Sequence, residues 1–162
     1  MMYTIKKGCH YSWHFPRFHF GKTNMKVKFT FTESCYFPMK EPDDYAINKL
    51  CGWGMANHHK NSIRCGWKPS PESHTIELWF YVYSNGQRIE QYFMNVLIGK
   101  EYELEMDLSG ANVLSFSVRD EEGTTTNSCY FKKPRFTWGA SLFPYIGGQL
   151  PARTDTSIEL SF

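Results

Sequence analysis

The chain has 162 residues, of which 41% are hydrophobic; this composition excludes a disordered protein and suits one domain over residues 1–162. Its formal net charge of +2 is too small to indicate nucleic acid as a partner. No apolar run approaches the ~18 residues of a transmembrane helix, so we expect no membrane partner.

The N-terminus and the cysteines bear on the compartment in which the chain folds. Residues 1–8 have no apolar stretch after their basic residues, so they do not resemble a secretory signal. The cysteines are odd in number and widely spaced, which is a poor framework for disulfides. They are Cys9, Cys35, Cys51, Cys65 and Cys129. We therefore expect reduced thiols and synthesis in the cytoplasm without a signal peptide.

Alternation of apolar and polar residues with a period of two is the main structural signal. It predicts strands at residues 26–32, 102–108, 114–118 and 157–162. Turns rich in Gly, Asn, Asp and Pro separate such segments, and only residues 43–48 suit a helical turn. Many short strands with almost no helix predict an all-β fold, an antiparallel two-sheet β-sandwich.

Charge is distributed unevenly along the chain. Residues 1–40 hold seven Lys and Arg and one acid, whereas residues 100–122 hold seven acids and two bases. We interpret these segments as two solvated patches that offset each other. A basic patch for a polyanion is the alternative.

Residues 50–67 predict a hairpin with a polar tip at residues 57–62. Its small residues allow a close approach to the backbone, either by a ligand or by a crossing side chain. They are Gly52, Gly54, Ala56 and Gly66. The polar candidates for ligand contact in this segment are Asn57, His58, His59 and Arg64.

Residues 78–93 predict a second hairpin, because Asn85-Gly86 suits a two-residue type I′ turn. Such a turn sets the register, so Tyr83 lies opposite Arg88 and, further out, Leu78 lies opposite Phe93. One face of this hairpin is apolar and suits the core. The other face carries Trp79, Tyr81, Tyr83, Arg88, Glu90 and Tyr92.

This second face has the composition of a sugar-binding surface. Aromatic rings offer flat apolar area to the C–H face of a pyranose, and charged groups bond to vicinal hydroxyls. Two alternatives stay open: another part of the fold covers the face, or the face contacts a protein. The candidate ligand-binding residues are Trp79, Tyr81, Tyr83, Arg88 and Tyr92, with Arg64 and His58 nearby.

The run from Ile63 to Val118, the segment 138–148 and the last strand resemble the concanavalin A-like lectin/glucanase sandwiches. The resemblance lies in pattern and spacing. It implies a jelly roll of two curved sheets whose concave face often binds carbohydrate.

The same group includes glucan hydrolases, whose alternating acids are imitated here by Glu103, Glu105 and Asp107. A solvated stripe is the alternative interpretation of these acids. A polysaccharide lyase would need a base, such as His58, beside Arg64. No CxxC, HExxH, GxSxG or phosphate-loop motif is present, so we assign no catalytic residue, metal or cofactor.

The leading hypothesis is a non-catalytic, lectin-like domain that binds a glycan or polysaccharide on an aromatic concave sheet face. The second is a structural or decoration protein of a phage-like virion, whose aromatic face contacts protein or a further copy of the chain. A virion component would be made in the cytoplasm and meet cell-surface glycans later. The third hypothesis is a small polysaccharide lyase or glycoside hydrolase.

Overall fold

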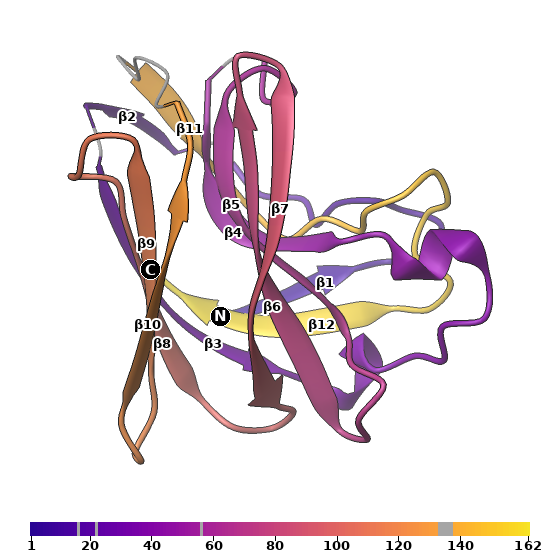
Figure 1. The fold of residues 1–162 in the computed structure, drawn as a ribbon. Coiled ribbons are helices and arrows are strands. Elements are labelled where there is room, and N and C mark those ends of the chain that lie inside the picture. Colours follow the sequence, from indigo (N-terminus) through magenta and orange to yellow (C-terminus); the bar gives the residue numbers. More distant parts are fainter. Residues whose placement is uncertain (16, 22, 56, 133–137) are drawn as a thin grey trace.

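The computed structural model describes residues 1–15, 17–21, 23–55, 57–132 and 138–162, and these form two packed antiparallel sheets (Figure 1). In order across the sheet, the first sheet comprises β1 (Met2–Ile5), β12 (Thr156–Ser161), β3 (Asn24–Phe31), β8 (Tyr102–Asp107), β9 (Val113–Arg119) and β10 (Thr124–Tyr130). The second sheet comprises β2 (Phe18–Phe20), β11 (Trp138–Leu142), β4 (Asn48–Gly54), β5 (Ser62–Pro69), β6 (Thr75–Ser84) and β7 (Gln87–Leu97). The predicted all-β sandwich is confirmed.

Helical structure among the described residues is limited to two short 3-10 turns. The turn η2 (Pro42–Tyr45) begins one residue before the predicted segment 43–48. The turn η1 (Glu33–Cys35) has no counterpart in the sequence-based prediction. No helix in the described part of the chain is long and apolar enough to cross a membrane.

The strands predicted from alternation lie where the pattern placed them, within two residues at each end. In β3, Val27, Phe29 and Phe31 are buried while Lys26 and Lys28 are exposed. The strand β8 shows the same alternation through Leu104 and Met106. Such a pattern arises because successive side chains of a strand point to opposite faces, of which one meets the core and one meets water.

Aromatic rings from both sheets fill the core between them. Phe80 of β6 stacks on Phe116 of β9 with ring centroids 4.0 Å apart. The ring centroid of Phe31 of β3 lies 5.2 Å from that of Trp67 of β5. All four side chains are fully buried, so aromatic rings of the two sheets pack directly against each other and hold the sheets together.

None of the five cysteines forms a disulfide among the described residues. Cys51 and Cys65 lie opposite each other in the register of β4 and β5. Burial raises the pKa of Cys65 well above its ordinary value. The protonated thiol is therefore the stable form, and these side chains pack as small apolar groups.

Candidate ligand-binding site

The hairpin of β6 and β7 has the predicted turn. Asn85 and Gly86 have φ of 52° and 83°, which are the values that a type I′ turn requires. Ser84 pairs with Gln87, Tyr83 with Arg88 and Trp79 with Tyr92, as the turn predicts.

The prediction of the register fails beyond Trp79. Leu78 pairs with Met94 and not with Phe93, because the register shifts between Leu78 and Trp79. The extra residue on β7 is Phe93, which is buried and packs its ring 5.6 Å from that of Phe80. A bulge of this kind is not visible in an alternating sequence, since it follows from core packing.

The face of the second sheet that points away from the core is hollowed by two adjoining pockets. The first has a volume of about 420 Å³, and we call it the Arg64 pocket. It is lined by Tyr11, Ser12, His14, Lys49, His58, His59, Arg64, Tyr81, Tyr83, Ser141, Leu142, Phe143, Pro144 and Tyr145. Its size falls within the range of small-ligand sites.

The second pocket, which we call the Trp79 pocket, has a volume of about 390 Å³. It is lined by Pro42, Tyr45, Ala46, Ile47, Lys49, Lys68, Trp79, Tyr81, Arg88, Glu90 and Gly148. Lys49 and Tyr81 line both pockets, so the two adjoin at these side chains.

Six of the seven predicted ligand-binding residues line one of these pockets. His58, Arg64 and Tyr83 line the Arg64 pocket, Trp79 and Arg88 line the Trp79 pocket, and Tyr81 lines both. Tyr92 lies outside both sets of lining residues. It is half exposed, and its ring meets that of Trp79 edge-on at 5.8 Å.

The indole of Trp79 is held by two charged neighbours. Its Nε1 donates a hydrogen bond of 3.0 Å to the carboxylate of Glu77. The ammonium of Lys68 lies 4.6 Å above the ring centroid, in cation–π contact, and 3.4 Å from Glu77. The orientation of the ring is therefore set before any ligand arrives.

The tip of the β4–β5 hairpin folds over Tyr83. The ring of His59 meets that of Tyr83 edge-on at 5.6 Å, and Tyr83 in turn lies 5.7 Å from Tyr81. The hydroxyl of Ser62 donates to the carbonyl of His58 at 2.7 Å. These contacts place His58 at the wall of the Arg64 pocket.

Lys49 is a site residue that the sequence-based reasoning missed. Its backbone exchanges two hydrogen bonds with Tyr145, at 2.8 and 3.0 Å. Its Nζ donates to the carbonyl of Ile47 at 2.6 Å and lies 4.3 Å above the ring centroid of Tyr81. A shift in register between Lys49 and Cys51 turns Lys49 toward the pockets, and alternation alone does not reveal such a shift.

Positive charge gathers between the two pockets. Lys49 is 8% exposed, and burial, followed by the charge of Arg64, lowers its pKa to about 8. Arg64 is 7% exposed, and its pKa is also lowered by burial. Burial and the charge of Arg64 lower the pKa of His58. Burial raises the pKa of Tyr81 to about 12, so its hydroxyl stays protonated at neutral pH.

The glycines of the β4–β5 hairpin serve close packing within the protein. A Cβ on Gly66 would lie 2.4 Å from Cγ2 of Ile47, and one on Gly52 would lie 2.1 Å from the carbonyl oxygen of Ile63. A Cβ on Gly54 would touch Ser62 at 3.0 Å. These glycines therefore make room for neighbouring atoms of the protein and not for a ligand. Ala56 lies outside the described residues.

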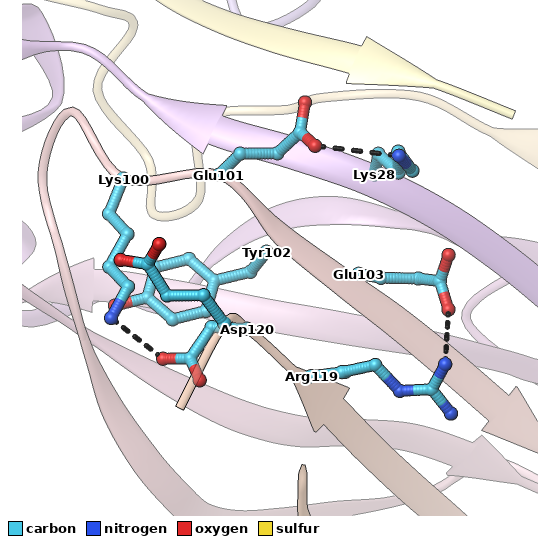
Figure 2. A pocket seen from close by; sticks show the side chains of 8 residues that line it. Lys28, Lys100, Glu101, Tyr102, Glu103, Arg119 and Asp120 are labelled. Carbon is cyan, nitrogen blue, oxygen red and sulfur yellow. Dashed lines mark hydrogen bonds and ion pairs between the residues drawn. The ribbon is translucent and has the colours of Figure 1, made fainter. Parts of the chain in front are cut away.

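The acidic stripe lies on the other sheet and is neutralised by neighbouring cations. Lys28 lies 3.5 Å from Glu101, and Arg119 lies 3.8 Å from Glu103; Figure 2 shows both pairs beside Tyr102. Glu105 accepts a hydrogen bond of 2.7 Å from Asn24 and lies 3.1 Å from Lys26, and these two contacts lower its pKa. The basic and acidic segments of the sequence thus pair across β3 and β8.

These contacts differ from those of a glycosidase acid, which needs a raised pKa. The carboxylate of Asp107 accepts bonds from the backbone and side chain of Ser109. Among the described residues, no three His, Cys, Asp or Glu side chains meet in an arrangement that could hold a metal ion.

Comparisons with known proteins show the fold. No family model and no curated protein matches the chain. A functionally unknown protein from Saccharomyces cerevisiae is 10% identical over 97% of this chain and 81% of its own, with a TM-score of 0.53. The carbohydrate binding module CBM66 from Bacillus subtilis is 9% identical over 90% of this chain and 74% of its own, with a TM-score of 0.42. Tailspike protein 2 of Escherichia coli O157:H7 bacteriophage CAB120 is 9% identical over 86% of this chain and 20% of its own, with a TM-score of 0.48. The likeness to the yeast protein is one of β-sandwich architecture alone.

Proposed function

We propose that residues 1–162 form a single non-catalytic, lectin-like domain of the concanavalin A-like type, which binds a glycan or polysaccharide. The ligand lies on the outer face of the second sheet, across the Arg64 and Trp79 pockets. One observation carries this proposal: aromatic rings and cationic hydrogen-bond donors from adjacent strands line two adjoining pockets.

The chemistry of these side chains suits a sugar. The rings of Trp79 and Tyr83 present apolar area to the C–H face of a pyranose, and their polar tips reach hydroxyls at its edge. Arg64, Arg88 and Lys49 have only donors, which bond to pairs of hydroxyl or carboxylate oxygens. Two adjoining pockets allow successive sugar units of one chain to bind.

A binding function without catalysis agrees with the electrostatics of the site. Because its pKa is raised to about 12, Tyr81 stays protonated at neutral pH and does not act as a base. Glu103 and Glu105 belong to the other sheet and are ion-paired. His58 remains as a group able to accept a proton, and an assay for unsaturated sugar ends tests this role. We expect no such ends to form, and their appearance with a uronate polymer would show that the domain is a lyase.

A glycan array with matched variants tests the binding proposal. We expect retention of at least one glycan class and a loss of tenfold or more in affinity for Tyr83→Ala and Trp79→Ala. Tyr130→Ala is the control, since Tyr130 is equally aromatic but exposed on β10 of the other sheet. Failure of the unaltered chain to bind any glycan would refute the proposal.

A second candidate function, contact with protein in a phage-like virion, is favoured by a surface that extends from Tyr11, at the Arg64 pocket, along the N-terminal segment. Five aromatic side chains in the N-terminal segment are more than half exposed: Tyr11, Trp13, Phe15, Phe18 and Phe20. Exposed apolar side chains in such number are typical of interaction surfaces. The mass of the chain in solution tests this function. An assembly that Trp13→Ser and Phe15→Ser disperse would support it, and a chain that stays monomeric at high concentration would contradict it.

A further inference from the structure

The Arg64 pocket holds positive charge that the protein itself does not balance. Arg64 and Lys49 are both more than nine-tenths buried, and no described acidic residue lines this pocket. The Nε and Nη2 atoms of Arg64 are buried without a hydrogen-bond partner among the described residues. Glu90 is the acid that acts on Lys49, and it forms its own ion pair with Arg88 at 3.1 Å.

Such an arrangement is costly for a folded protein. Removing an ion from water costs several kcal/mol even after relaxation, and proteins normally offset this with a carboxylate or a full set of hydrogen bonds. Polar groups left unsatisfied in this way are typical of functional sites, where a ligand supplies the missing partner.

The Trp79 pocket provides the contrast. There Arg88 pairs with Glu90, and Lys68 lies 3.4 Å from the carboxylate of Glu77. Each of these two cations has a carboxylate partner within the protein. Lys49 is shared by the two pockets, so they differ in Arg64, which lines the Arg64 pocket alone and has no carboxylate partner among the described residues.

We propose that the Arg64 pocket binds the anionic group of an acidic polysaccharide, either a carboxylate or a sulfate ester. This inference rests on the proposed function, since it assigns the substrate class of the same site. Arg64 and Lys49 bind the anion, and Tyr81 and Tyr83 contact the sugar that carries it. The Trp79 pocket, whose cations Arg88 and Lys68 are paired with carboxylates, takes a neighbouring part of the chain. Because both cations are buried, salt screens them less than it screens surface charges.

Polymers that differ only in charge test this inference. Polygalacturonate is compared with its fully methyl-esterified form, alginate with its carboxyl-reduced form, and sulfated carrageenan with its desulfated form, with dextran as a neutral reference. We expect the chain to bind one charged polymer at least tenfold more tightly than its uncharged counterpart. Preference within the carboxylate or the sulfate pair identifies the anionic group.

Two substitutions locate the effect. Arg64→Met should abolish the preference for the charged polymer, whereas Arg119→Met should leave it intact. Arg119 is the matched control because it lies on the other sheet and its loss changes the net charge equally. Equal affinity for charged and uncharged polymers would overturn the inference while the proposed function stands. If no polymer or glycan binds at all, both fail. The comparison of polymers needs no variant, so the test holds even if Arg64→Met does not fold.

Discussion

Arg64 is a residue at which the needs of binding and of stability conflict. Two of its guanidinium nitrogens are buried without a hydrogen-bond partner in the described part of the chain, which a structural arginine would avoid. A methionine has a stem of similar length and no polar atom, so it removes the desolvation cost and keeps most of the packing.

We therefore expect Arg64→Met to raise the free energy of unfolding by about 1–2 kcal/mol while it removes binding of acidic glycans. For a chain of this size the melting temperature would rise by roughly 2–8 °C. Thermal unfolding followed by circular dichroism measures the change, and Arg88→Met is the control, expected within about 0.5 kcal/mol of the unaltered chain because Arg88 is exposed. A loss of stability in Arg64→Met would indicate a structural role.

Lys49 is a buried lysine whose charge depends on pH near 8. The charged and titratable groups around it are Arg64 from β5, Tyr81 from β6, Arg88 and Glu90 from β7, and Tyr145 from the segment after β11. Burial and the two arginines lower its pKa to about 8, and Glu90 opposes this shift. The folded chain thus loses this proton near pH 8, whereas the unfolded chain keeps it to about 10.5.

Two pH effects follow from Lys49. Affinity for an acidic glycan should fall as the pH rises through about 8, because the bound anion loses one of its two cations. The contribution of Lys49 to stability should rise between pH 8 and 10.5, since at this site the unfolded chain binds the proton and the folded chain does not. The buried thiols of Cys35, Cys65 and Cys129, whose pKa is raised, act in the opposite direction, so the contribution of Lys49 is the difference between the unaltered chain and Lys49→Met. Isothermal titration calorimetry and urea unfolding at several pH values measure both effects. Lys49→Met should remove the fall in affinity near pH 8 and the contribution of Lys49 to stability above it. An unchanged pH profile of binding would exclude Lys49 from the anion site.

Among the elements, the β6–β7 hairpin decides which side chains face the pockets. A shift of one residue in its register would turn Tyr81 and Tyr83 into the core. Gly86 holds this register through a φ of 83°, and no atom lies within 4 Å of the position that a Cβ would take. The requirement for glycine here is conformational and not steric.

Gly86→Ala should lower the free energy of unfolding by about 1–2 kcal/mol, because an L-residue resists the left-handed region. Urea denaturation measures the loss. Gly110→Ala is the control: a Cβ there meets Val113 at an ordinary 3.4 Å and φ is not positive, so we expect a change within about 0.5 kcal/mol. Equal stability of Gly86→Ala and the unaltered chain would show that the turn does not hold the register.

Strands differ in how far their sequence reveals them. The strands β3, β8, β9 and β12 alternate cleanly because one face is buried and the other solvated. The edge strand β10 is mostly polar and exposed, so it lacks an apolar period and was not predicted. Short edge strands such as β2 escape prediction for a similar reason, since three residues carry too little pattern.

At the scale of the whole molecule, the two sheets separate two charge patterns. The acidic stripe of β8 lies on the outer face of the first sheet, paired with lysines of β3, and the Arg64 pocket lies on the second sheet. The core stands between them. The stripe and the pocket should therefore act independently.

Replacement of Glu103 and Glu105 by glutamine tests this independence. Binding of glycans should stay within twofold of the unaltered chain, and stability should fall by less than about 1 kcal/mol, because both ion pairs are partly exposed. A glycan array and urea denaturation give the two measurements. A loss of binding with an unchanged fold would place the ligand on the first sheet and contradict the proposed site.

The sequence by itself determined the all-β sandwich, the β6–β7 turn and six of the residues that line the two pockets. These features are local, since the period of a strand and the φ values of a turn depend on neighbouring residues. The tertiary structure decided the bulge at Phe93, the place of Lys49 and the absence of a carboxylate beside Arg64 among the described lining residues. Those depend on which distant segments pack together, and no period in the sequence records that packing.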